Sequence, residues 1–277
     1  MIGRKQELEQ LKNALKAHRH VLLEGPVGVG KTTLALSAAV SLSKTESDRK
    51  ASFIRIDGDS RYTEQRLVGS WDPSRVSTLG FVNEAFLPGP LTRAMQEGRI
   101  LLINELNRMS EAVQNILLPA LDEKLIQITQ LGTITAQPGF SVIATQNPRD
   151  FVGTSSISEA LLDRFEWISM DYPSREEELE ILKSKSPDKS SSSLELIIDL
   201  VRLTRTFPKL RRGASVRTAL AIQDLMSDAS EKSFWDAVLM ALPTRIEIAP
   251  GAYPGLPFSM QIQSLITDLK SQLKKKS

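Results

Sequence analysis

A glycine-rich turn near the N-terminus constrains the fold of this chain more than any other feature. Residues 25–32 read GPVGVGKT and match the pattern G-x-x-x-x-G-K-[ST] in full. A short apolar run at 21–23 precedes the turn and an Ala/Leu-rich helical pattern at about 31–42 follows it, which is the strand–turn–helix context of a phosphate-binding loop. A chance glycine turn rarely meets both conditions, so the sequence predicts that the chain binds a nucleoside triphosphate.

The residue types in this loop suit phosphate chemistry. Glycines let backbone N–H groups wrap around phosphate oxygens, and the start of the following helix adds a partial positive charge. The Lys31 ammonium is placed to reach the β- and γ-phosphates, and the Thr32 hydroxyl is placed to bind Mg²⁺. The predicted nucleotide-binding residues of the loop are Gly25, Pro26, Val27, Gly28, Val29, Gly30, Lys31, Thr32 and Thr33.

Strand and helix patterns alternate over about the first 172 residues. Short apolar runs, typical of buried strands, recur between helical patterns. The predicted strands lie at 21–23, 53–56, 100–103, 141–145 and 167–170. This alternation predicts an α/β fold with an open, parallel, five-stranded sheet.

The strands stop near Tyr172, and the remaining patterns are helical. They lie at about 176–183, 194–206, 215–228 and 232–241. We therefore predict an α/β core at 1–172, a small all-helical domain at 173–248 and a C-terminal tail at 249–277.

The tail contains an amphipathic helical pattern. Apolar residues share one helix face, namely Ile262, Leu265, Ile266, Leu269 and Leu273. Docking of this face onto the chain's own helical domain or onto a neighbouring subunit is the main interpretation. A helix that binds a partner or a membrane surface is the alternative, since three lysines follow at 274–276.

The composition narrows the classes of function. The 277 residues contain no cysteine, which excludes disulfides, thiol catalysis and cysteine-bound metals. The two histidines, His18 and His20, are too few for a histidine-rich zinc site. Thirty-five Lys and Arg against 33 Asp and Glu leave a formal charge of +2, which argues against nucleic acid as a partner. The basic run at 209–212 lacks interleaved aromatic residues and fits a solvated loop better than a nucleic-acid contact.

Neither a leader nor a membrane span is visible in the sequence. The first ten residues, MIGRKQELEQ, have no apolar stretch, and no run approaches the ~18 apolar residues of a membrane span. We expect a cytoplasmic protein with no membrane insertion.

Five further motifs follow the phosphate loop. They are FLPGPL at 86–91, ILLINELNR at 100–108, VIATQNP at 142–148, EALLDRF at 159–165 and GASVR at 213–217. Their types and order resemble the AAA+ ATPases and, within them, the MoxR group. The resemblance extends from Ile2 to about Ile248 and implies an ATPase core followed by a helical lid, with ATP and Mg²⁺ as cofactors.

The resemblance assigns roles to individual residues. Glu105 is expected to orient or deprotonate the attacking water, and Asn147 to act as the polar sensor at a strand end. Arg164 is expected to act in trans on the γ-phosphate of a neighbouring subunit, and Arg217 to act in cis from the lid. Ile2 and Gly3 match the family's box beside the adenine. Without the resemblance, the two arginines would be interpreted as surface charges.

One departure from the family pattern affects the metal site. Asn104 stands where the motif has Asp, so the position keeps a carbonyl oxygen that can accept from a metal-bound water but loses a negative charge. Mg²⁺ is bound mainly by the nucleotide phosphates and by Thr32, and it retains several waters. We therefore expect a weakened magnesium site and slow hydrolysis. A second departure is Pro119, which should kink or break its helix.

Two inserted segments concern contact with a client protein rather than hydrolysis. Residues 69–86 match the family's helix-2 insert, and residues 125–136 alternate around Gly132 as expected for a hairpin. The resemblance implies that such elements face the pore of a ring, where Trp71 and Leu79 could touch a client protein. Packing of these loops on their own subunit is the alternative.

The sequence as a whole therefore predicts a MoxR-like, Mg²⁺-dependent ATPase that assembles as a homo-oligomeric ring, expected to be a hexamer, and remodels or matures a partner protein. The resemblance suggests a client with a von Willebrand factor A domain. One alternative is a nucleotide-binding scaffold that has lost turnover through Asn104. A further alternative is a nucleic-acid-directed motor of the same superclade.

Overall fold

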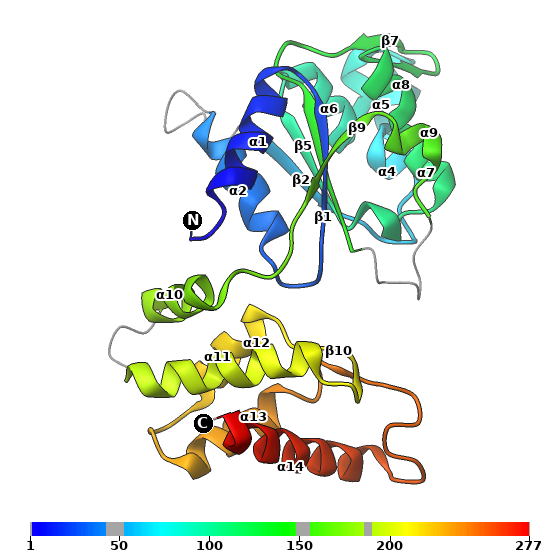
Figure 1. Ribbon diagram of the computed structural model, residues 1–277. Helices are drawn as coiled ribbons and strands as arrows, with labels where there is room; N and C mark the ends of the chain where they lie inside the picture. The colour runs from blue at the N-terminus through cyan, green and yellow to red at the C-terminus, as the bar shows by residue number, and fades with distance from the viewer. Residues whose placement is uncertain (1, 43–52, 148–155, 186–189, 277) are drawn as a thin grey trace. The chain divides into compact units, whose positions relative to one another are not determined.

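The computed structural model describes residues 2–42, 53–147, 156–185 and 190–276 (Figure 1). The chain forms two compact units. The sheet unit comprises mainly residues 3–26 and 30–171, and the lid unit comprises mainly the residues from Tyr172 onward. Each unit has a hydrophobic core of its own.

The sheet unit is built on five parallel strands in the order β2-β5-β8-β1-β9. They are β1 (His20–Glu24), β2 (Phe53–Asp57), β5 (Ile100–Asn104), β8 (Ser141–Gln146) and β9 (Phe165–Ser169). The three central strands each contain an apolar run of three or four residues and are buried almost throughout, as expected where helices cover both faces of a parallel sheet. The predicted α/β fold with a five-stranded parallel sheet is confirmed.

Helices hold this sheet from both sides (Figure 1). They are α1 (Lys5–Lys16), α2 (Lys31–Ser41), α4 (Glu64–Leu67), α6 (Pro90–Glu97), α7 (Glu111–Asn115), α8 (Leu117–Asp122) and α9 (Glu159–Leu162). α1 and α2 lie on one face and α6 on the other. Leu101 and Ile103 of β5 share a fully buried core with Leu91 and Met95 of α6. This packing fixes where the carboxyl end of β5 lies.

The helix predicted around Pro119 is interrupted. α7 ends and α8 begins on either side of Ile116. Proline has no N–H group, so Pro119 cannot donate to the carbonyl of Asn115, four residues earlier. The break falls where that hydrogen bond would form.

Residues 69–88 form a small antiparallel unit of their own. β3 (Gly69–Trp71) pairs with β4 (Phe86–Pro88), and α5 (Pro73–Leu79) and the 3-10 turn η1 (Asn83–Ala85) lie between them. The Trp71 ring packs edge-on against Phe81 and Phe86, at centroid distances of 5.0 and 5.3 Å. Leu79, by contrast, is 54 % exposed. A second antiparallel pair, β6 (Leu125–Ile128) and β7 (Gly132–Thr135), forms the hairpin before β8.

The lid unit is helical apart from one short antiparallel pair. Its elements are α10 (Arg175–Lys185), α11 (Ser191–Thr206), β10 (Leu210–Arg212), α12 (Val216–Leu225), α13 (Glu231–Ala241), β11 (Glu247–Ile248) and α14 (Phe258–Lys276). The basic run at 209–212, expected as a solvated loop, is largely a strand that pairs with β11. Two of its three charges are partnered, because Lys209 pairs with Asp268 and Arg211 with Glu247.

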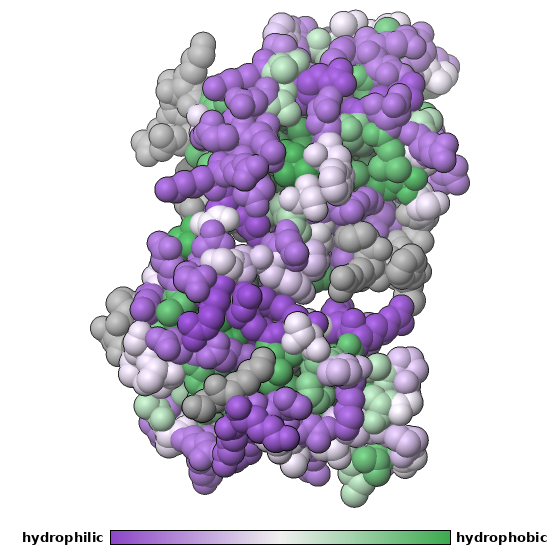
Figure 2. Space-filling view, in the orientation of Figure 1, coloured by the Kyte–Doolittle hydropathy of each residue, from purple (hydrophilic) through white to green (hydrophobic). Residues whose placement is uncertain are grey.

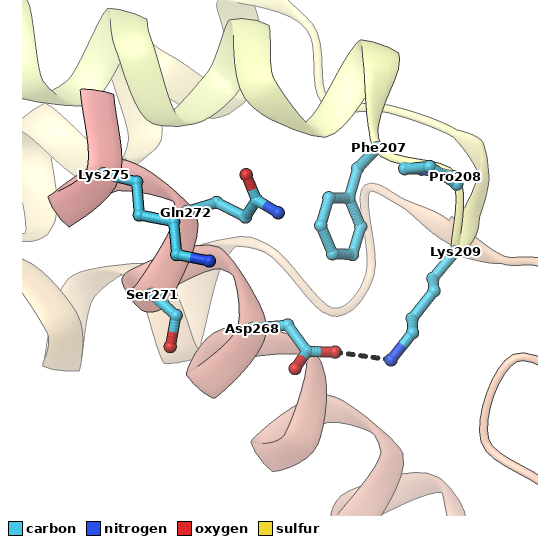
Figure 3. Close-up of a pocket in the computed structure, with 7 residues that line it drawn as sticks. All are labelled: Phe207, Pro208, Lys209, Asp268, Ser271, Gln272 and Lys275. Carbon is cyan, nitrogen blue, oxygen red and sulfur yellow. Dashed lines mark hydrogen bonds and ion pairs between the residues drawn. The ribbon is translucent and has the colours of Figure 1, made fainter.

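The tail helix α14 is part of the lid core. Ile262, Leu265, Leu269 and Leu273 are buried there among residues of α11, α12 and α13. An open cavity of about 370 Å³ lies between α14 and the segment that follows α11 (Figure 3). A 2.8 Å ion pair from Lys209 Nζ to Asp268 Oδ2 connects its two sides. The Tyr253 hydroxyl donates to the same carboxylate at 2.8 Å. The apolar face predicted for the tail therefore packs on its own lid.

Hydrophilic residues predominate on the face of each unit that Figure 2 shows, with apolar residues in smaller patches. Within the part of the chain that the structure describes, every helix is too short or too polar to cross a bilayer.

Candidate nucleotide site

The phosphate loop connects β1 to α2 and has the backbone that its glycines allow. Gly28 and Gly30 adopt φ angles of +82° and +96°, in the left-handed region that residues with a Cβ avoid. At Gly25 a Cβ atom would collide with the carbonyl oxygen of Met170. Gly30 caps the N-terminus of α2, an eleven-residue helix whose first N–H groups face the loop. The loop thus presents backbone donors at a helix N-terminus, the arrangement that suits an anion.

Lys31 points back over this loop. Its ammonium donates to the carbonyl oxygens of Gly25 at 2.6 Å and Pro26 at 2.9 Å. The positive charge therefore lies within the curve of the loop, where the β- and γ-phosphates are predicted to bind.

Asn104, the last residue of β5, links three strand ends and the start of α2. Its Oδ1 accepts from the hydroxyls of Thr32 at 2.8 Å and Thr145 at 3.0 Å. Its Nδ2 donates to Oδ1 of Asp57 at 2.9 Å. Both functional ends of the amide are therefore engaged, and the Thr32 hydroxyl lies beside the oxygen that replaces the expected carboxylate.

Asp57 is a residue of this site that the sequence analysis did not single out. It ends β2, directly beside Asn104 in the parallel register. A hydrogen bond from Arg55, at 2.9 Å, holds the pKa of the Asp57 carboxyl below its usual range, and the Asn104 amide acts in the same direction against the effect of burial. The sequence signal that could have identified Asp57 is an acidic residue at the end of a predicted strand.

Glu105 follows in an uncommon backbone conformation. Its φ of +58° lies in the left-handed region, where side chains with a Cβ are rarely found. Strained residues of this kind occur often at functional sites. The Glu105 N–H donates to the Thr145 hydroxyl at 2.9 Å, and its carboxylate pairs with Arg108 Nε at 2.8 Å. The carboxylate is one-third exposed, so a ligand at the strand ends could reach it.

Asn147 comes directly after β8, between the ends of β5 and β1. It is buried, with 5 % of its surface exposed. The adjoining Gln146 donates to the carboxylate of Glu24 at the end of β1. Pro148, the last residue of the same motif, lies outside the described residues.

The two arginines lie on different units. Arg164 follows α9, and its Nε and Nη2 donate to Asp122 Oδ2 at the end of α8, at 2.9 and 2.7 Å. Its side chain is 29 % exposed. Arg217 is the second residue of α12 in the lid unit.

Ile2 and Gly3 lie immediately before α1. Gly3 has a φ of +67°, and the next residue, Arg4, is buried and donates to the carbonyl of Asp171 and to Glu7.

The strand ends suit a hard cation with few protein ligands. Among the described residues, no group of three or more His, Cys, Asp or Glu side chains could hold a metal unaided. The oxygens present come from a threonine hydroxyl, an amide and two carboxylates, and these are donors that Mg²⁺ accepts while keeping waters and phosphate oxygens. The residues therefore fit a magnesium ion brought in with a nucleotide.

A comparison with protein families identifies the family of this chain. The model of the AAA domain, dynein-related subfamily, matches residues 20–165, which contain the phosphate loop, Glu105 and Asn147. The chain belongs to the AAA+ ATPases. Its motif order predicted this family and, within it, the MoxR group, and both are supported by the relatives found.

Two relatives and one solved structure illustrate the extent of the likeness. The gas vesicle ATPase GvpN of Haloferax mediterranei is 31 % identical over 229 residues, which are 77 % of this chain and 63 % of that protein. A protein of Staphylococcus haemolyticus is 33 % identical over 225 residues, 78 % of this chain and 81 % of that one. The crystal structure of a candidate ATPase from Cytophaga hutchinsonii, 22 % identical, covers 96 % of this chain and 90 % of its own with a TM-score of 0.52, which shows a shared fold. The chain spans just under two thirds of the gas vesicle ATPase's length.

Proposed function

We propose that this AAA+ protein hydrolyses ATP with Mg²⁺ and uses the cycle to remodel a partner protein. One observation carries the proposal. The phosphate loop, Glu105 and Asn147 all lie at the carboxyl ends of the adjacent strands β1, β5 and β8. Ligands of open parallel sheets bind at that edge.

The residues divide the work of γ-phosphate transfer to water. Backbone N–H groups of the loop and the Lys31 ammonium would hold the phosphates and offset their charge. Mg²⁺, when bound, neutralises charge on the β- and γ-phosphates, and Thr32 is the residue placed to ligate it. Glu105 would orient the attacking water, and the neutral amide of Asn147 would hold that water or the γ-phosphate without repelling it. Arg108 pairs with the Glu105 carboxylate at 2.8 Å and would help to orient it.

A ring is part of the proposal because Arg164 would complete the site of a neighbouring subunit. The Asp122 carboxylate holds the guanidinium at the end of α8, and Arg164 keeps 29 % of its side-chain surface exposed. Arg217 would contribute from the lid of the same subunit. Both roles follow from the MoxR resemblance, as does the expected hexamer.

The client is proposed from the same resemblance. A cytoplasmic partner with a von Willebrand factor A domain, remodelled by a chaperone-like ring, fits the MoxR group. The exposed Leu79 and its neighbours Phe81 and Val82 in the insert offer an apolar contact surface on the sheet unit.

A nucleotide-dependent scaffold is the second candidate. The observation that favours it is the neutral Asn104, which leaves β5 without the terminal carboxylate expected of a hydrolysing site. A motor directed at nucleic acid is less well supported, because Lys209 and Arg211 of the basic run are paired with acidic residues.

An ATPase assay run alongside a size measurement tests the proposal. Specific activity should rise with protein concentration as rings form, and Lys31→Ala should abolish it together with nucleotide binding. Nucleotide-dependent assembly without turnover, at any magnesium concentration, would support the scaffold instead. Concentration-independent activity of a proven monomer would contradict the ring.

A further inference from the structure

The neutral Asn104 has an acidic neighbour, Asp57, at the end of the adjacent strand β2. Asp57 and Asn104 are partners in the parallel register of β2 and β5, and their side chains share a 2.9 Å hydrogen bond. Asp57 is also accessible, with 62 % of its side-chain surface exposed.

The hydrogen bonds explain why one of the two positions is an amide. Two hydroxyls, from Thr32 and Thr145, donate to the oxygen of Asn104, so its NH₂ group faces Asp57 and needs an acceptor there. An aspartate at 104 would set two carboxylates at hydrogen-bond distance with no hydrogen between them. Like charges in such contact disfavour each other strongly. The pair is therefore complementary as one amide and one carboxylate.

We propose that Asp57 supplies the negative charge of the magnesium site that position 104 lacks. The negative charge stands at the end of β2 instead of at the end of the neighbouring strand β5. Asn104 connects the two, because an amide whose N–H donates to a carboxylate becomes a better acceptor at its oxygen. That oxygen faces Thr32, the residue placed to ligate the ion. Asp57 is thus a positioning residue that acts through Asn104, and this inference rests on the proposed function.

The local backbone supports this arrangement. The N–H of Gly58 donates to the Asn104 carbonyl at 2.7 Å, and a Cβ at Gly58 would collide with the carbonyl of Glu105. The Asp57-Gly58 turn therefore packs directly on the Asn104-Glu105 turn. Arg55 pairs with Asp57 at 2.9 Å and offsets part of its charge.

Nucleotide binding with and without magnesium tests the inference independently of turnover. The probe is a fluorescent ADP analogue, titrated in excess EDTA and over a series of Mg²⁺ concentrations. Asp57→Asn keeps an acceptor oxygen for the Asn104 amide and removes the charge, with an NH₂ group in place of the second carboxylate oxygen. It should leave binding in EDTA unchanged and raise the Mg²⁺ concentration for half-maximal tightening about tenfold, at the low end of the range for groups that support metal ligands.

Three further variants complete the design. Asp59→Asn removes the same charge two residues away, where the acid pairs with Arg61, and should behave as the parent. The swap Asp57→Asn with Asn104→Asp restores one carboxylate and one amide, and it should return the magnesium response. Arg55→Gln should lower the magnesium requirement. A thermal melt of each variant establishes that it is folded.

The outcomes separate the inference from the proposed function. If Asp57→Asn shows the parent's magnesium response, as the control Asp59→Asn should, or if the folded double swap fails to restore that response, the inference is wrong. The same holds if the parent's own binding is indifferent to magnesium. A parent that binds the probe with a magnesium response but never hydrolyses ATP contradicts the proposed function alone.

Discussion

Replacing His20 by Asn should remove part of the acid sensitivity of the sheet unit. His20 begins β1 and is 96 % buried, since only 4 % of its surface is exposed. Its Nδ1 accepts from the backbone N–H of Val142 at 2.9 Å, and its Nε2 lies 2.7 Å from the Lys124 ammonium. Burial, followed by the positive charge of Lys124, lowers the pKa of His20 from 6.5 to about 4.

The direction of the pH effect follows from proton uptake. Between pH 6.5 and about 4 the unfolded chain protonates His20 while the folded chain does not, so the unfolded state binds more protons. Stability is therefore complete above pH 6.5 and falls as the pH is lowered toward 4. At 1.36 kcal/mol for each unit, the whole shift corresponds to about 3 kcal/mol, of which about 2 kcal/mol is lost between pH 7 and pH 5.

Urea denaturation at pH 7 and pH 5 measures this loss. Trp71 and Trp167 report on the sheet unit when Trp235 of the lid is replaced by Phe. Asn at position 20 keeps an acceptor for Val142 but does not titrate, so the variant should lose about 2 kcal/mol less than the parent over this interval. The exposed His18→Asn serves as the matched control. Equal losses in the parent and in His20→Asn would refute the reasoning.

Three other predictions concern single side chains. Arg164→Ala should leave nucleotide binding intact and lower turnover about 10³-fold, whereas Asp163→Ala should leave turnover unchanged. Unchanged turnover of an assembled Arg164→Ala ring would contradict a role of Arg164 in the neighbouring subunit's site. Leu269→Ala should cost the lid about 3 kcal/mol, read from Trp235 fluorescence in urea, because Leu269 is fully buried on the core-facing side of α14. A cost no larger than that of the exposed Gln263→Ala would mean that the tail is not part of the lid core. Glu178→Gln should lower the lid's free energy of unfolding by a similar amount, about 3 kcal/mol, because this fully buried carboxylate pairs with Arg202 and Arg205. A loss of stability below about 1 kcal/mol would show that these ion pairs are dispensable.

The elements that sequence reasoning located are those whose pattern is local. A central parallel strand such as Ile100–Asn104 is an apolar run because both of its faces are buried, and the tail helix shows its buried face as a 3.6-residue period. Short paired segments such as β10 and β11 carry no such period. Their pairing depends on residues that are more than thirty positions apart, so the basic run was expected to be a loop.

The same distinction applies to the candidate site. The phosphate loop and the acid at 105 stand in motifs of fixed spacing. Asp57 does not, because its proximity to Asn104 depends on β2 being the neighbour of β5, and the strand order is a property of the folded sheet. The role of Glu178 could not be predicted for a related reason. In a charged helical pattern it resembles a surface acid, and only the packing of α10 on α11 buries it beside Arg202 and Arg205.

Turnover by the Glu105→Gln variant, measured beside nucleotide binding, tests the central claim most directly. Gln keeps the size and one acceptor oxygen of Glu105, but it lacks the charge and cannot deprotonate or firmly orient a water. The parent should hydrolyse ATP in the presence of Mg²⁺, and the variant should bind ATP as tightly while its turnover falls by at least about 10², the contribution typical of such a group. Equal turnover by parent and variant, or a parent that binds ATP with Mg²⁺ and leaves it intact, would contradict the account.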